Sequence, residues 1–351
     1  MNDMLFRHVE VAEIKSAENA LPHYFALLRG EEKPNFYYAR EVKVSFSKDC
    51  SIDELWQLHE EGIEKLHNNE LSEKPEQSLL DLKSLIAHRL MEECILCEIK
   101  CRVDRKKQLG YCRVKESRIV SAFLHLGEEP ELIPSYTVFF SGCNFRCAFC
   151  QNWDISQQRV GIAYSPDEIA IRIGVARMEG AKNVNFVGGE PTPNIPFILD
   201  ILREIEVPIP ILWNSNMYMS EKTMRLLDGI VDIYLSDFKW GNNKDAMKYS
   251  KVPQYWETVT RNFLLAKDHY RAEFLIRHLV MPNHLECCTK PILKWISENL
   301  GRDVRINVMF QYRPEYKANG YPEIARRLTY DEMEKAVELI KGFGFKNALV
   351  G

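Results

Sequence analysis

Hydrophobic positions repeat differently in the first part of the chain and in the rest. Residues 51–69 begin with Ser51 as a helix cap and continue with apolar residues at helical spacing, and residues 76–92 repeat that pattern. Residues 36–46 alternate between apolar and polar side chains, which predicts a half-buried strand. We therefore expect residues 1–93 to form an α+β accessory region, and none of its segments carries a chemical signature.

Beyond position 135, short apolar segments alternate with amphipathic ones. One amphipathic segment starts at Ser165-Pro166, a helix cap followed by proline at the first helical position. Strand–helix alternation predicts a parallel sheet, and six such units fit an α/β fold with a partial, TIM-like (β/α)6 barrel over residues 136–351. In such folds chemistry gathers at the carboxyl ends of the strands. The six predicted strands are 136–142, 183–189, 210–216, 232–238, 273–280 and 305–310.

Composition narrows the class of protein. The chain has 351 residues, 27% of them charged, and a net charge of −4, which gives no electrostatic footprint for nucleic acid or for an anionic membrane. Its first twenty residues lack a basic segment followed by an apolar stretch, so no secretory signal is expected. No apolar run approaches the roughly 18 to 20 residues of a membrane span. We expect a cytoplasmic protein with no nucleic-acid or membrane partner.

Seven of the ten cysteines fall between positions 94 and 150. In a reducing compartment, spaced cysteines are more often metal ligands or redox centres than disulfides. Cys143, Cys147 and Cys150 directly follow the first predicted barrel strand, and three thiolates can ligate three irons of a cubane. Ordinary ferredoxin clusters are closed by four cysteines, so a triad leaves an open iron, as a catalytic cluster requires. An incomplete zinc or ferredoxin site is the alternative. No role is predicted for the adjacent Cys287 and Cys288.

The triad resembles the C-x3-C-x-aromatic-C signature of the radical S-adenosylmethionine (SAM) superfamily, with Phe149 as the aromatic residue. The resemblance implies an oxidoreductase with a four-iron, four-sulfur (4Fe-4S) cluster, whose open iron is chelated by the methionine part of SAM. It implies that an electron from a low-potential donor cleaves a sulfur–carbon bond of SAM. The 5′-deoxyadenosyl radical so released then abstracts hydrogen from a substrate, while the protein binds, orients and shields.

Three further segments at predicted strand ends fit this resemblance. A GGE segment follows the second strand and would contact the amino group of the cofactor. An N-S-N segment ends the third strand, where the family often binds ribose or carboxylate. A D-x-K segment ends the fourth, as in glycyl-radical activating enzymes. His278 lies at the end of the fifth strand, as a cofactor contact or as a packing residue. The cofactor-binding candidates are thus Phe149, Gly188, Gly189, Glu190, Asn214, Asn216, Asp237, Lys239 and His278.

Longer segments between about positions 90 and 345 resemble a subgroup related to pyruvate formate-lyase activating enzyme. By that analogy the substrate is a protein. A small-molecule substrate is the first alternative, and a non-catalytic iron–sulfur scaffold or sensor is a rival from another class. The substrate, the electron donor, the oligomeric state and the role of residues 1–90 do not follow from the sequence.

A second group, Cys94, Cys97, Cys101 and Cys112, precedes the triad within a predicted metal-binding segment, residues 94–135. Four thiolates fit zinc, a single iron or an auxiliary iron–sulfur cluster, and the spacing does not rank them. A structural site near the barrel entrance is our expectation. Activating enzymes with auxiliary clusters carry them after the triad, so the order here weakens the analogy with those enzymes.

Overall fold

The computed structural model describes residues 16–351, whose central feature is one eight-stranded sheet with strands in the order β1 to β8. β1 pairs with β2 antiparallel, and every later pair is parallel. The sheet is thus a mixed α/β partial barrel of the expected type, with β1 and β8 at its two edges. The strands are β1 (Ile119–His125), β2 (Ser135–Phe140), β3 (Asn183–Gly188), β4 (Ile211–Ser215), β5 (Ile233–Asp237), β6 (Glu273–Leu279), β7 (Arg305–Met309) and β8 (Ala348–Val350).

The six predicted barrel strands correspond to β2–β7, each within two residues of its expected bounds. In the sequence these strands are continuous apolar runs, because helices cover the parallel strands. In β4, for example, all five residues are buried. The sequence missed the two edge strands. β1 is mostly half-exposed, and β8 has only three residues, so neither shows a strong pattern.

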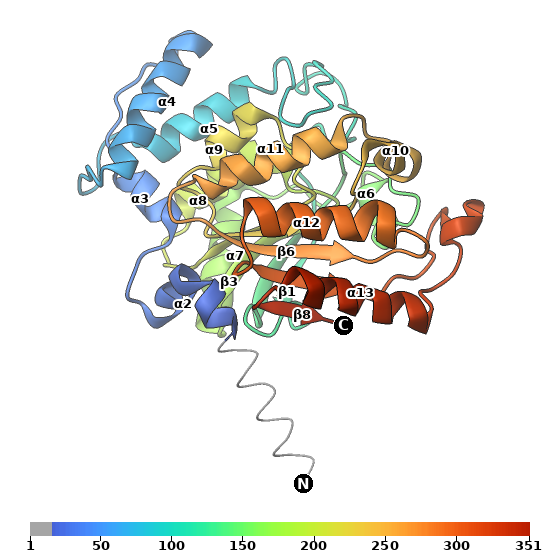
Figure 1. The fold of residues 1–351 in the computed structure, drawn as a ribbon. Helices are drawn as coiled ribbons and strands as arrows, with labels where there is room; N and C mark the ends of the chain where they lie inside the picture. The colour runs from blue at the N-terminus through green and yellow to red at the C-terminus, as the bar shows by residue number, and fades with distance from the viewer. Residues whose placement is uncertain (1–15) are drawn as a thin grey trace.

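Helices pack around the sheet (Figure 1). Ser51 and Ser165 cap α4 and α7 as predicted, and Pro166 is the first residue of α7. The helices are α2 (Pro22–Arg29), α3 (Asn35–Glu41), α4 (Ile52–His67), α5 (Leu79–Arg89), α6 (Trp153–Ser156), α7 (Pro166–Met178), α8 (Ile195–Glu204), α9 (Glu221–Leu227), α10 (Asn243–Asp245), α11 (Tyr255–Lys267), α12 (Lys290–Asn299) and α13 (Tyr330–Phe343).

The strand predicted over residues 36–46 is wrong, because this segment begins as helix α3. The side chain of Asn35 donates to the carbonyls of Val231 and Tyr270, which fixes the start of the helix against the barrel. Phe36 and Ala39, three residues apart, are the fully buried apolar side chains of this helix. Apart from one isolated bridge, the described part of the accessory region is helical. The division of the chain into three parts stays a prediction.

Helix α2 closes the end of the barrel at which the strands begin. Leu21 and Tyr24 pack there with inward-facing residues of β4, β5 and β6. Glu273, the first residue of β6, accepts hydrogen bonds of 2.8 Å from the backbone N–H groups of His23 and Tyr24. In Figure 1 the arrow of β6 points away from α2. The carboxyl ends of the strands therefore form the other end of the barrel.

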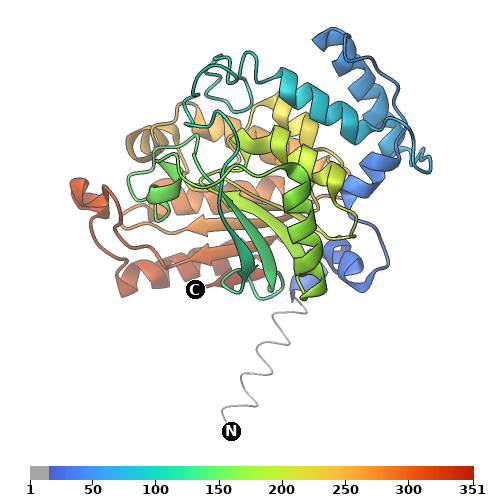
Figure 2. The same ribbon diagram turned by 180° about the vertical axis from the view of Figure 1, so that it is seen from behind.

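The two edges of the sheet lie on one side of the molecule. Figure 2 shows the β1–β2 hairpin and, next to it, the C-terminal end of the chain with β8. Among residues 16–351 no helix has the length and apolarity needed to cross a bilayer. Most of the segment examined for a secretory signal lies in residues 1–15, outside the described part of the chain.

Candidate active site at the carboxyl ends of the strands

A cavity of about 720 Å³ opens at the carboxyl ends of the strands, where the sequence predicts the chemistry. Residues from the ends of β3 to β7 line it, among them Gly188, Asn214, Asp237, Arg277 and Met309. Residues from the ends of five successive strands thus face one space, as in other barrels with parallel strands.

The triad loop forms one wall of this cavity, and all three triad cysteines line it. The sulfur of Cys143 accepts the backbone N–H of Phe145 at 3.3 Å, and the sulfurs of Cys147 and Cys150 lie 3.1 and 3.2 Å from serine hydroxyls. Burial raises the pKa of all three thiols, that of Cys147 to about 12. These thiols are therefore neutral unless a bound metal displaces their protons.

The chemistry of this donor set fits an iron–sulfur cluster. The three sulfurs face one cavity. They are not all within 4.8 Å of one another, so within the described residues they are spaced more widely than the ligands of a single ion. Lys239, from the D-x-K segment, lies beside Cys147 and Cys150. Burial alone would lower the pKa of Lys239, but Asp237 and Cys147 raise it overall. Its ammonium group can thus offset thiolate charge.

Glu190 of the GGE segment is a buried junction between strand ends. Its carboxylate accepts hydrogen bonds from the hydroxyls of Thr192 and Ser215, both at 2.6 Å, and from the backbone N–H of Asn216 at 3.0 Å. Burial raises the pKa of Glu190. The residue therefore joins the end of β3 to that of β4, in addition to the cofactor contact expected from the sequence.

The two glycines before Glu190 let the end of β3 approach the triad loop. A Cβ atom on Gly188, whose φ is +115°, would lie 2.1 Å from the backbone nitrogen of Phe140. A Cβ atom on Gly189 would lie 2.0 Å from the carbonyl oxygen of Gly142, directly before Cys143. Glycine is thus required here by the chain's own backbone.

The structure brings all but one of the predicted cofactor-binding residues to the cavity. Phe149, Asn214 and Asn216 line it together with the GGE and D-x-K segments. His278 does not, because its two ring nitrogens bond to the carbonyl of Phe238 at 2.8 Å and to the hydroxyl of Thr289 at 2.9 Å. Burial lowers the pKa of His278 to about 4, so it is a neutral packing residue.

Sequence reasoning missed a charged network on the far wall of the cavity. Arg277, at the end of β6, donates to Glu129 at 2.8 and 2.5 Å and also to Glu128. Asn307 of β7 donates to the same Glu129 at 2.8 Å. The acidic segment after His125 was its one signal in the sequence, because Arg277 and Asn307 lie 148 and 178 positions from Glu129.

The upstream cysteine group lies next to the triad. The carbonyl of Cys112 accepts the backbone N–H of Cys143 at 3.2 Å. Arg146, inside the triad, stacks its guanidinium 4.4 Å from the ring centroid of Tyr111 and donates to the carbonyl of that tyrosine. The two cysteine loops are therefore in direct backbone contact.

A partial barrel that presents three thiols to a polar cavity at its strand ends fits an iron–sulfur enzyme with an open cluster position. The sequence profile of the radical SAM superfamily matches residues 137–296. The chain is 47% identical to the uncharacterised protein MJ0674 of Methanocaldococcus jannaschii over 334 residues, 92% of this chain and 97% of that protein. The chain belongs to the radical SAM superfamily, which implies a 4Fe-4S cluster and SAM.

Two solved structures are also similar to this chain. SuiB of Streptococcus suis bound to SAM matches with a TM-score of 0.45 and 15% identity, over 60% of this chain and 48% of that chain. A domain of a pyruvate-formate lyase-activating enzyme from Bacteroides vulgatus matches with a TM-score of 0.37 and 16% identity, over 49% of this chain and 99% of that chain. The present chain spans less than half the length of SuiB.

Proposed function

We propose that the cavity at the strand ends is the site where this radical SAM enzyme cleaves SAM and abstracts hydrogen from a substrate. Cys143, Cys147 and Cys150 would hold the 4Fe-4S cluster. The observation that carries this proposal is that the triad, the GGE segment and the polar strand ends all face one cavity of about 720 Å³. That volume lies within the range typical of small-molecule and cofactor sites, about 300–1,000 Å³.

The chain's own residues would bind and orient SAM in this cavity. When bound, the cluster and SAM supply a one-electron cleavage that yields the 5′-deoxyadenosyl radical. Asn214 lines the cavity with its side-chain amide available, while Asn216 is held by a 2.8 Å hydrogen bond to Asn144. Asp237, bonded to Lys239 at 2.5 Å, adds a charged group at the same wall. Phe149, packed edge-on against Trp240, adds an apolar side chain to the cavity lining beside the triad.

For the substrate, we infer a polypeptide segment, as in activating enzymes. The cavity extends to both open edges of the barrel, since His125 at the end of β1 and Val350 in β8 line it. Phe123 and Leu126, next to His125, are exposed apolar side chains, 45% and 67% accessible. An edge strand with exposed apolar neighbours is a surface that an extended peptide can bind by strand addition.

The first test is release of 5′-deoxyadenosine from SAM by anaerobically reconstituted, reduced protein. We expect release by the wild-type chain, and none by a Cys143→Ala/Cys147→Ala/Cys150→Ala variant. Equal release by that variant would refute the proposed site. Absence of both release and SAM binding in wild-type protein with a full triad cluster would favour the scaffold alternative.

The substrate class needs its own test. Anaerobic cell extract is separated by size into a polypeptide fraction and a small-molecule fraction, and each is added to the reduced enzyme with SAM. We expect the polypeptide fraction to increase deoxyadenosine release, and protease treatment of that fraction to abolish the increase. An increase confined to the small-molecule fraction would instead establish the small-molecule alternative.

A further inference from the structure

The four upstream cysteines meet at one point of the fold. A Cβ atom on Gly110 would lie 3.4 Å from the sulfur of Cys112 and 3.5 Å from that of Cys101, so these two sulfurs lie close to the same point of the chain. The backbone of Cys94 hydrogen-bonds to those of Arg102 and Val103, directly after Cys101, so these two cysteines lie side by side. Cys97 lies within range of the charges of both Cys112 and Cys101. The group is therefore a true convergence of side chains.

Each of the four sulfurs is arranged as a ligand thiolate. In each case the backbone N–H of the residue two positions further along the chain favours the thiolate, although burial raises the pKa of Cys97 and Cys112 overall. An N–H group beside a thiolate also tunes an iron–sulfur cluster. The donors to Cys94, Cys97, Cys101 and Cys112 are Leu96, Ile99, Val103 and Val114.

A buried cation beside the group has no carboxylate partner. Arg105 is only 1% exposed, and its guanidinium donates to the carbonyls of Val114 at 2.9 Å and Pro193 at 2.7 Å. Within residues 16–351 no acidic side chain forms an ion pair with it, although all four cysteines feel its charge. A buried charge normally has a counter-charge. Four metal-bound thiolates would supply one.

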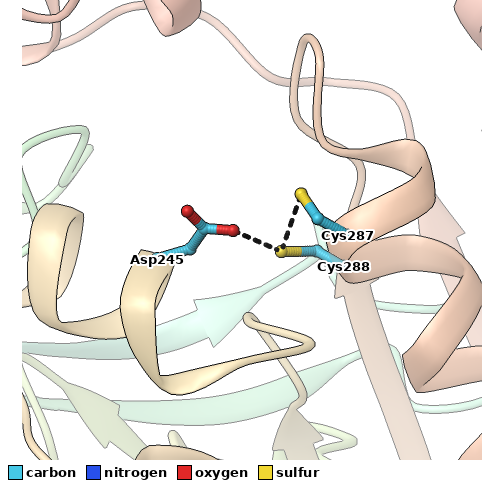
Figure 3. Close-up of side chains that lie close together, drawn as sticks. All are labelled: Asp245, Cys287 and Cys288. Atoms are coloured by element: carbon cyan, nitrogen blue, oxygen red, sulfur yellow. Dashed lines mark hydrogen bonds between the residues drawn. The ribbon is translucent and has the colours of Figure 1, made fainter.

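The spacing of the sulfurs favours a cluster over a single ion. Zinc–sulfur bonds of about 2.3 Å in a tetrahedron hold the four sulfurs about 3.8 Å apart. In the described residues, the one set of three or more ligand atoms that all lie within 4.8 Å of one another is Asp245, Cys287 and Cys288, a different part of the molecule (Figure 3). No three of the four upstream sulfurs meet that limit, whereas a cubane holds its thiolates further apart.

We propose that Cys94, Cys97, Cys101 and Cys112 bind an auxiliary 4Fe-4S cluster directly behind the triad. The backbone bond between Cys112 and Cys143 fixes the two centres next to each other, and Arg105 balances the charge of the auxiliary one. Because four protein thiolates close this cluster, it has no iron open to SAM. The proposal does not depend on the substrate or on turnover.

Iron and acid-labile sulfide are counted in full-length protein reconstituted anaerobically with ferrous iron and sulfide. We expect about eight irons per chain in wild-type protein and about four in the Cys143→Ala/Cys147→Ala/Cys150→Ala variant, with matching sulfide. The reduced triad variant should give an electron paramagnetic resonance (EPR) signal that is unchanged by SAM. About four irons in wild-type protein and none in the triad variant would overturn the proposal. The iron count of wild-type protein, about eight or about four, tests the proposal even if the triad variant does not fold.

Zinc is the competing occupant, and the compact set of Figure 3 could bind it as well. Cys288 donates to Asp245 at 3.4 Å, and the sulfurs of Cys287 and Cys288 are 3.8 Å apart. Zinc is therefore also measured in a Cys287→Ser/Cys288→Ser variant, which removes the thiols of that set only. One zinc per chain that persists in this variant and the triad variant alike, with no cluster iron in the latter, would assign zinc to the upstream group and refute the cluster.

Discussion

Glu190 is a residue whose place in the site follows from the sequence, while its hydrogen bonds do not. The GGE segment and the strand before it are neighbours in the sequence, so the sequence predicts that Glu190 lies in the cavity. Its partners Ser215 and Asn216 belong to the next strand end, some 25 positions away, and no local pattern predicts that one carboxylate accepts hydrogen bonds from both. The predicted cofactor contact of His278 is wrong for the same reason: its ring nitrogens bond to Phe238 and Thr289, partners that no local pattern predicts.

The first residue-scale prediction concerns Glu190→Gln. The amide can accept at one oxygen only, so one of the buried donors from Thr192, Ser215 and Asn216 loses its acceptor. We expect the free energy of unfolding to fall by about 1–3 kcal/mol and SAM binding to weaken. Urea unfolding and equilibrium SAM binding measure the two effects. Glu298→Gln, at an exposed position of α12, is the matched control and should change neither; an equal effect of both variants would contradict the assigned role.

The second prediction concerns Arg105→Gln. Removing a buried cation beside an anionic cluster disfavours the added electron, so the reduction potential of the auxiliary cluster should become more negative. An EPR redox titration of the triad variant measures it. Arg102→Gln, on the same loop but exposed and paired with Glu93, should leave the potential unchanged. Equal reduction potentials in the Arg105→Gln and Arg102→Gln variants would show that Arg105 does not lie beside the proposed cluster.

At the scale of elements, the close approach between the end of β3 and the triad loop positions the site. The strands themselves were predictable, since β2–β7 are buried parallel strands with continuous apolar runs. The edge strands and α3 were not. Residues 36–46 contain β-favouring aromatic residues, but hydrogen bonds from Asn35 to Val231 and Tyr270, distant in sequence, fix a helix there.

Gly189→Ala tests that close approach. The added Cβ would lie 2.0 Å from the carbonyl oxygen of Gly142, which is rigid backbone, so the triad loop must move. We expect a loss of about 2–4 kcal/mol in the free energy of unfolding, together with less iron bound by the triad. Gly174→Ala is the control, because nothing lies within 4 Å of its Cβ position in α7. It should be neutral or stabilise by up to about 1 kcal/mol. Similar losses in both would exclude a specific clash.

At the scale of the whole molecule, helix α2 of the accessory region closes the barrel opposite the cavity, while α5 packs against the outer helices α8 and α9. That placement could not be read from the sequence, because residues 1–93 carry no motif and their contacts are long-range. The buried contact of His23 and Tyr24 with Glu273 ties α2 to the first residue of β6. In the described residues, the accessory region thus packs against the barrel and does not line the cavity at the strand ends.

This contact predicts a pH dependence of stability. Burial raises the pKa of Glu273 from 4.5 to about 7, so between these values the folded chain holds a proton that the unfolded chain has lost. The free energy of unfolding therefore falls as pH rises through this window, by about 1–3 kcal/mol. Burial also raises the pKa of the neighbouring Asp232, and Asp232 in turn raises that of His23 against the effect of burial, so both act in the same direction.

Glu273→Gln removes one of these titrations. Urea unfolding between pH 5 and 7.5 should show a smaller decrease in stability for this variant than for wild type. The exposed Glu298→Gln should keep the wild-type slope. An unchanged slope in Glu273→Gln would show that this carboxyl does not titrate in the window.

The central claim is that the triad leaves an iron open to SAM in the cavity at the strand ends. EPR of the reduced, reconstituted Cys94→Ala/Cys97→Ala/Cys101→Ala/Cys112→Ala variant, which retains the triad, tests it most directly, with wild-type protein measured in parallel. The account predicts that adding SAM changes the signal of the triad cluster in both proteins. A triad cluster whose signal is the same with and without saturating SAM in wild-type protein would contradict it.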